Sequence, residues 1–363
     1  MRDRYIATML LHAVGDTVGF KNGEWEFKKG GIEKTLEKLY EFIDLGGVNH
    51  INLSDWSVSD DTIMHLKTAE SILKDHSNMG TLCTDLTKNY VVAYEFMKTG
   101  AKRFPGSALM KYLEKLSKGM KCYETPYDDQ AGGSGASIRT PCVGLVFYND
   151  TDKLIEIAIE TSRITHNNAV GYLGGLASAL FVSYAIRNIS INKWPYKMMK
   201  LFDKGIIDAY IKKTGRDYAK YERDAHIFIE KWKRYIDNKF NDKKVAIQRK
   251  SSINLLYRNK YYNESFAYLE NGKRSEFIGS GGDDSVILAY DCLLDAGKNW
   301  EKIVIYSMLH MGDTDTTGCL AGAFYGSLYG FQDVPKNFYE HIEFKDQIIS
   351  IATKLYEKFY KAG

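Results

Sequence analysis

Residues 313–330 have the sequence DTDTTGCLAGAFYGSLYG, in which two aspartates and three threonines lead into an apolar segment. Glycine then recurs at every fourth position, so an α-helix would place these residues on one side: Gly318, Gly322, Gly326 and Gly330. Each glycine costs a helix roughly 1 kcal/mol relative to alanine, so the stripe is unfavourable unless a neighbour uses the missing side chains. We therefore predict a helix whose backbone is approached closely by a second helix.

A similar acidic segment, Ser59-Asp60-Asp61-Thr62, precedes another stretch with helical apolar spacing. Together with Asp313–Thr317 it supplies four carboxylates and several hydroxyls, and such oxygen ligands suit hard divalent cations. Four carboxylates in one pocket would repel one another, whereas two divalent cations would balance their charge. The alternative is that these residues only cap their helices. Two such segments in one chain favour a two-metal site.

Helical periodicity dominates the rest of the chain. Apolar residues recur at helical spacing in residues 5–14, 63–73 and 154–159, and few segments alternate as strands do. We predict an all-α fold in a compact single domain covering residues 1–363. Residues 203–275 are richer in charged residues, Tyr and Asn, and form either a peripheral helical layer or an insertion.

Composition restricts the function classes. The hydrophobic content of 44% and the net charge of +3 are ordinary for a soluble protein and do not indicate nucleic acid binding. Residues 169–186 lack formal charges and are nearly long enough to cross a bilayer, but their glycines and serines favour a buried helix. The five cysteines, without CxxC spacing, are expected to be reduced thiols. We expect a cytoplasmic monomer with no membrane partner.

Three glycine-containing turns are candidates for holding a phosphate through backbone N–H groups. They are Gly132–Ser137, which is followed by Arg139, then Gly279–Gly282, and the segment Arg103–Ser107. None matches the dinucleotide-binding or P-loop pattern. Each turn alone is weak evidence, because flexible loops have the same composition.

Further segments complete a pattern that runs through the whole chain. In order these are Gly15-Asp16, Asn22–Phe27, Val58–His65, Gly132–Arg139, Thr165-His166, Gly171–Gly174, Ala289–Asp291 and His310–Thr317. In this order they resemble the ADP-ribosylglycohydrolase family, and within it the ADP-ribosylarginine hydrolases. The resemblance implies an all-α fold with a cleft that holds two Mg²⁺ ions, for which Mn²⁺ is a substitute.

The resemblance also assigns site residues. The implied metal ligands are Ser59, Asp60, Asp61, Asp313, Asp315 and Thr316. The implied substrate-binding residues are Gly106, Ser107, Ala108, Gly132, Gly133, Ser134, Gly135, Arg139, Gly279, Ser280 and Gly281. Asp60 or Asp61 is the candidate general base, and Glu26 is expected to gate the site or assist proton transfer.

Some positions depart from the family pattern. Met311 replaces a glycine, Asn167-Asn168 replace a histidine-rich stretch, and the loop after Gly282 is shorter, with Asp283-Asp284. These changes affect the adenosine and acceptor sides of the implied pocket. Both acidic segments are intact, so we predict an active enzyme.

The resulting hypothesis is Mg²⁺-dependent hydrolysis of the N-glycosidic bond between ADP-ribose and arginine on mono-ADP-ribosylated proteins. One alternative keeps the chemistry and changes the linkage to ADP-ribosylserine or an O-acyl ester. Two alternatives come from other classes: a helical two-metal phosphohydrolase and a non-catalytic ADP-ribose-binding protein. The partners expected are modified proteins and ADP-ribose.

Overall fold

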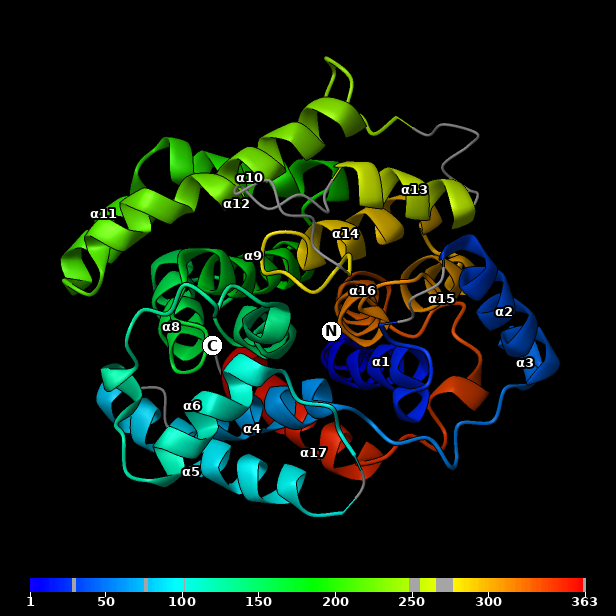
Figure 1. Ribbon diagram of the computed structural model, residues 1–363, viewed down its shortest axis with the longest axis horizontal. Coiled ribbons are helices and arrows are strands. Elements are labelled where there is room, and N and C mark those ends of the chain that lie inside the picture. Colours follow the sequence, from blue (N-terminus) through cyan, green and yellow to red (C-terminus); the bar gives the residue numbers. More distant parts are fainter. Residues whose placement is uncertain (28–30, 75–77, 101, 248–254, 266–276, 362–363) are drawn as a thin grey trace.

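The chain is helical throughout its regular structure, as predicted (Figure 1). The computed structural model describes residues 1–27, 31–74, 78–100, 102–247, 255–265 and 277–361, and these residues form no β-strand. The α-helices are α1 (Arg2–Phe20), α2 (Gly31–Asp44), α3 (Gly47–His50), α4 (Asp60–Lys74), α5 (Met79–Lys98), α6 (Ser107–Ser117), α7 (Pro141–Val146), α8 (Thr151–Arg163), α9 (Ala169–Ile186), α10 (Trp194–Asp203), α11 (Ile206–Thr214), α12 (Tyr218–Lys239), α13 (Leu255–Ser265), α14 (Ser285–Ala296), α15 (Trp300–Met308), α16 (Thr314–Tyr329) and α17 (Lys345–Tyr356). Short 3₁₀ helices include η1 (Lys21–Gly23), η2 (Cys122–Glu124), η3 (Ser134–Arg139), η4 (Ile191–Lys193) and η6 (Lys336–Phe338), and a π-helix, η7 (Glu357–Lys361), follows α17.

The glycine stripe of α16 packs directly against α1. A Cβ atom added at Gly322 would lie 2.0 Å from the carbonyl oxygen of Leu11, and one at Gly318 would lie 2.4 Å from that of Gly15. Any larger side chain would therefore force the two backbones apart. The predicted close approach of a second helix is confirmed, with α1 as that helix. Gly330 has a different role, because it ends α16 with a positive φ of 69°.

This packing aligns the end of α1 with the beginning of α16. A Cβ atom at Gly19 would lie 2.0 Å from the carbonyl oxygen of Thr314, in the first turn of α16. The hydroxyl of Thr314 donates a hydrogen bond to the Gly19 carbonyl at 2.8 Å. Asp16 and Asp315, one on each helix, are therefore held near each other.

Helix α9 is buried along its length among α7, α8, α12 and α16. Among the described residues it is the one helix long and apolar enough to cross a membrane, and all of it lies inside the protein. The predicted buried helix is confirmed.

Helices α10 to α13 lie together at the top of Figure 1, over α9 and α14. Residues 203–275 contribute α11, α12 and α13 to this outer layer, while residues 248–254 and 266–276 are outside the described part of the chain. Buried ion pairs connect the layer to α14: Arg258 of α13 pairs with Asp291 and Asp295 at 2.7 and 2.6 Å.

The cysteines differ in part from the expectation. Cys83 of α5 and Cys122 of η2 form a disulfide, so the prediction of five reduced thiols is wrong for these two residues. Helix packing brings the pair together across 39 positions of sequence, which spacing alone does not reveal. Cys142, Cys292 and Cys319 are free and buried.

Candidate metal centre and substrate pocket

The two acidic segments meet in the folded protein. The Thr316 hydroxyl donates a hydrogen bond to the Asp61 carboxylate at 3.2 Å, which joins the beginning of α16 to the beginning of α4. Each segment also caps its own helix: the Ser59 hydroxyl accepts from the Asp61 N–H at 3.1 Å, and the Asp313 carboxylate accepts from the Thr316 N–H at 3.4 Å. Capping and convergence therefore occur together, because the helix ends orient the side chains toward a common space.

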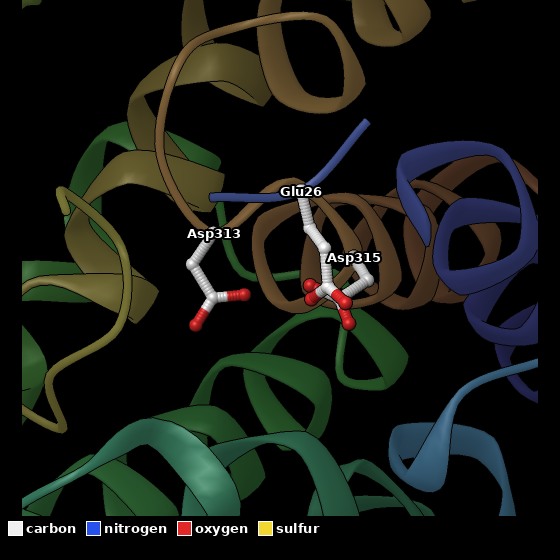
Figure 2. A group of neighbouring side chains, drawn as sticks. All are labelled: Glu26, Asp313 and Asp315. Atoms are coloured by element: carbon white, nitrogen blue, oxygen red, sulfur yellow. The ribbon is translucent and has the colours of Figure 1, made fainter. Parts of the chain in front are cut away.

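Glu26 brings a carboxylate from the N-terminal region into the same space. Figure 2 shows its side chain directed toward Asp313 and Asp315, and the three residues offer carboxylate oxygens that lie within 4.8 Å of one another. The N–H of Phe27 donates to the Gly312 carbonyl at 3.1 Å, which holds this part of the chain beside the acidic loop.

Asp16 is a sixth carboxylate at this centre, and no site role was predicted for it from the sequence. It accepts hydrogen bonds from the N–H of Ser59 at 3.1 Å and from the N–H and hydroxyl of Thr62 at 3.0 and 2.5 Å. Asp16 on α1 therefore fixes the beginning of α4, where Asp60 and Asp61 lie. The available signal in the sequence was an aspartate within the apolar stretch of residues 5–20.

We call Asp16, Glu26, Asp60, Asp61, Asp313 and Asp315 the acidic cluster. All six are buried, with exposed fractions between 0 and 7%. Burial raises the pKa of Asp16 to about 7 and that of Glu26 to about 10, and the Asp315 carboxylate contributes to both increases. Burial and neighbouring carboxylates likewise raise the pKa values of Asp60, Asp61 and Asp313 well above the ordinary range.

This electrostatic arrangement fits cations. Buried carboxylates close together are stable either when protonated or when a positive charge compensates them. The surrounding hydroxyls of Ser59, Ser134 and Thr316 complete a set of oxygen donors, and such donors are those preferred by Mg²⁺ and Mn²⁺. The residues present therefore fit a centre for hard divalent cations.

Two of the predicted glycine turns lie against each other. The first glycine turn (Gly132–Gly135) and the second (Gly279–Gly281) are paired through an antiparallel bridge between Gly133 and Gly281. The Ser134 N–H donates to the Ser280 carbonyl at 2.9 Å, and the Gly282 N–H donates to the Gly132 carbonyl at 2.9 Å.

Both turns are connected to the acidic cluster. The Ser134 hydroxyl lies 3.5 Å from an Asp313 carboxylate oxygen and 3.4 Å from the Thr316 hydroxyl. The Asp313 N–H donates to the carbonyl of Ile278, directly before the second turn, at 2.9 Å. Five parts of the sequence therefore form one site, namely residues 16–26, 59–62, 132–135, 278–282 and 313–316.

The third turn, with Gly106, Ser107 and Ala108, begins α6. It follows Arg103, whose carbonyl accepts a hydrogen bond from the Asp60 N–H at 3.2 Å. The chain thus leads from the acidic cluster to this turn within a few residues. Direct binding of substrate by the turn stays a prediction.

Arg139 does not fit the substrate contact expected of it. Its side chain is fully buried, and the guanidinium donates to the Thr165 hydroxyl at 2.7 Å and to the carbonyls of Thr161 and Ser162 at 3.0 Å. The guanidinium also lies over the ring of Tyr90. Arg139 therefore supports η3, which contains part of the first glycine turn, from the protein interior.

Other residues in the family pattern have structural partners. The His310 ring accepts from the Gly312 N–H at 3.0 Å through Nδ1, so Nε2 carries the proton and donates to the Thr317 hydroxyl at 2.7 Å. Burial lowers the pKa of His310 to about 3, so this histidine is a neutral support of the acidic loop. Asn167 donates to the Thr125 carbonyl and to the Asp217 carboxylate at 2.9 and 3.0 Å.

The chain is similar to known proteins along nearly its whole length. A family model described as ADP-ribosylglycohydrolase matches residues 1–363. The chain belongs to the ADP-ribosylglycohydrolase family. ADP-ribosylhydrolase ARH1 of Dictyostelium discoideum is 39% identical to it, covering 96% of this chain and 92% of that protein. The putative ADP-ribosyl glycohydrolase L444 of Acanthamoeba polyphaga mimivirus is 34% identical over 94% of this chain and 67% of its own length.

More distant members share the fold. ADP-ribosylhydrolase ARH3 of Danio rerio is 23% identical over 99% of this chain and 91% of that protein. A solved structure described as an ADP-ribosylglycohydrolase-related protein complex has a TM-score of 0.56 at 18% identity and covers 98% of both chains. The predicted fold class is confirmed, as is the resemblance to the ADP-ribosylglycohydrolase family.

Proposed function

We propose that this member of the ADP-ribosylglycohydrolase family hydrolyses the N-glycosidic bond between ADP-ribose and arginine on mono-ADP-ribosylated proteins. Family membership and the names of its relatives support a glycohydrolase acting on ADP-ribose linkages. The observation that carries the proposal is the meeting of the two acidic segments, with Thr316 bonded to Asp61 beside the glycine turns. The arginine linkage is favoured by the segment Trp25-Glu26-Phe27, which resembles the ADP-ribosylarginine hydrolases.

Two Mg²⁺ ions would be held by the hydroxyl and carboxylate oxygens of Ser59, Asp60, Asp61, Asp313, Asp315 and Thr316. When bound, such ions orient sugar hydroxyls and lower the pKa of a water molecule. The residues fit this use because their carboxylates are buried together and lie at the beginnings of α4 and α16.

Residues of the site would also bind the substrate and transfer protons. The first glycine turn would contact the pyrophosphate, because three of its four residues are glycines and a ligand can approach their backbone closely. In the second turn the N–H groups of Gly279 and Gly281 already donate to the Asp284 carboxylate, so this turn would support the first one and line the pocket. Asp60 or Asp61 would accept a proton from the attacking water, since cleavage at the anomeric carbon requires an activated nucleophile. Glu26, which lies beside Asp313 and Asp315, would gate the site or assist proton transfer.

The proposal is tested with an arginine-ADP-ribosylated protein and a serine-ADP-ribosylated protein assayed side by side with Mg²⁺. We expect ADP-ribose release from the arginine linkage at a rate at least tenfold higher. Asp60→Asn should abolish release while the helical circular dichroism spectrum is unchanged. Asp152→Asn is the matched control, because Asp152 is also a first-turn aspartate but is exposed on α8.

Other outcomes would replace the proposal. Faster release from the serine linkage would change the substrate class, and release of inorganic phosphate would indicate a phosphohydrolase. Tight binding of ADP-ribose without turnover would indicate a binding protein. The cytoplasmic location, the monomeric state and the absence of nucleic acid or membrane partners stay predictions.

A further inference from the structure

Lys231 of α12 forms an ion pair with Asp283, which lies between the second glycine turn and α14. Each side chain is 5% exposed. A buried ammonium or carboxylate is unfavourable unless it is paired. Breaking this ion pair would leave two unpaired charges in the interior, so the contact is strongly favoured. The outer helical layer is therefore attached at the border of the candidate substrate pocket.

Asp284, the next residue, is hydrogen-bonded to the second glycine turn. Its two carboxylate oxygens accept hydrogen bonds from the N–H groups of Gly279 and Gly281 at 2.8 and 2.9 Å. Burial and the adjacent Asp283 carboxylate raise the pKa of Asp284 to about 7, and the Lys231 ammonium opposes this increase. Lys231 thus compensates a pair of adjacent buried acids whose repulsion would otherwise disturb the turn.

The segment from Ile278 to Asp284 is bonded to both parts of the site. The Ile278 carbonyl accepts from the N–H of Asp313 in the acidic cluster, and the Ser280 carbonyl accepts from the N–H of Ser134 in the first glycine turn, each at 2.9 Å. A displacement of this segment would therefore move a candidate metal ligand and a phosphate-binding turn together.

We propose that Lys231 is a positioning residue, whose ion pair with Asp283 holds residues 278–284 in place and thereby sets the affinity of the pocket for ADP-ribose. The identity of the ligand rests on the proposed function, whereas the positioning of the segment does not. Nothing in the family pattern of acidic segments and glycine turns includes α12.

A second lysine on α12 provides a matched control. Lys239 pairs with Asp291 and Asp295 at 3.0 and 2.7 Å. Lys239 lies eight residues after Lys231, and Asp291 lies eight residues after Asp283, so the two ion pairs are equivalent in spacing. Eight residues correspond to about 12 Å along a helix, so this pair lies well away from the second glycine turn. Lys239 is also buried, with its side chain 8% exposed. Lys239→Met therefore removes a comparable buried charge without touching the turn.

The experiment compares full-length Lys231→Met, Lys231→Arg and Lys239→Met with the wild type in Mg²⁺. Hydrogen exchange of the peptide covering residues 277–284 should be at least tenfold faster in Lys231→Met, and near the wild-type rate in Lys239→Met. The Kd for ADP-ribose should rise about tenfold or more in Lys231→Met, since small displacements of binding groups have effects of this size. In turnover assays KM should rise together with the Kd, and Lys231→Arg should restore most of both changes.

A general loss of stability would not produce this pattern. Equal hydrogen exchange of residues 277–284 in Lys231→Met and Lys239→Met, or an equal Kd, would overturn the positioning role. If Lys231→Met does not fold, the double variant Lys231→Met/Asp283→Asn removes both charges of the ion pair. Hydrogen exchange of residues 277–284 and the Kd for ADP-ribose should then change in the double variant as stated for Lys231→Met, and equality with Lys239→Met would again overturn the role. If the wild type fails to bind ADP-ribose, the proposed function fails, and the exchange measurement alone decides the role of Lys231.

Discussion

Asp16 offers a sharp test of how the acidic cluster is charged, because it lies in the cluster without belonging to the proposed metal ligands. Burial and the Asp315 carboxylate raise the pKa of Asp16 from 3.8 to about 7. A carboxyl group whose pKa is higher in the folded state stabilises the folded protein below its pKa in the unfolded state. This contribution is lost as the pH rises through its pKa in the folded state. Asp16→Asn removes this loss and retains an oxygen that can accept hydrogen bonds from Ser59 and Thr62.

The size of the effect follows from the pKa difference. One pKa unit corresponds to about 1.4 kcal/mol, so a rise to about 7 lowers the wild-type free energy of unfolding by about 4 kcal/mol between about pH 4 and pH 8. The variant lacks this decrease. The free energy of unfolding of Asp16→Asn minus that of the wild type should therefore increase by about 4 kcal/mol over the same range.

The assay is urea unfolding of both proteins in EDTA at several pH values. Burial lowers the pKa of His12 to about 4 and those of His166 and His310 to about 3, so these histidines destabilise the folded protein as the pH falls. They are present in both proteins and cancel in the difference. A difference that stays constant or decreases from pH 4 to pH 8 would refute the description of the cluster.

Three further predictions concern the fold and the metal. Gly322→Ala should destabilise the protein by about 1–3 kcal/mol in urea unfolding, because its Cβ would lie 2.0 Å from the Leu11 carbonyl oxygen. Gly80→Ala, in an exposed first turn of α5, is the control and should cost less in the same assay, because its Cβ would meet only a side-chain oxygen, that of Asn78 at 3.2 Å. Arg258→Met should cost about 3–5 kcal/mol of stability, since it removes a cation paired with two buried aspartates. Mg²⁺ should raise the thermal unfolding midpoint more at pH 8 than at pH 5.5, because metal binding requires deprotonated carboxylates; an equal increase would argue against carboxylate ligands.

The sequence was sufficient for features that depend on local chemistry. Glycine at every fourth position predicted the close approach of another helix, and Gly318, Gly322 and Gly326 do contact α1 closely. The sequence did not identify α1 as that helix. Acidic and hydroxyl residues before apolar helical stretches likewise predicted where α4 and α16 begin. Their convergence required more than one segment, since each alone is also an ordinary helix cap.

Features that depend on tertiary contacts were missed. Arg139 follows a glycine turn and was assigned to the substrate, but η3 directs its guanidinium into the interior toward α8. Asp16 bonds to a helix far along the sequence, and Cys83 pairs with Cys122 only because α5 and η2 lie together. No spacing rule connects such partners, because the packing of helices decides which side chains meet.

The measurement closest to the central proposal is the rate of ADP-ribose release from an arginine-ADP-ribosylated protein as the free Mg²⁺ concentration is varied. The convergence of Asp61, Thr316 and their neighbours predicts release that saturates with Mg²⁺ and falls to background in EDTA. Release that continues unchanged in EDTA, or no release at any Mg²⁺ concentration, would contradict it.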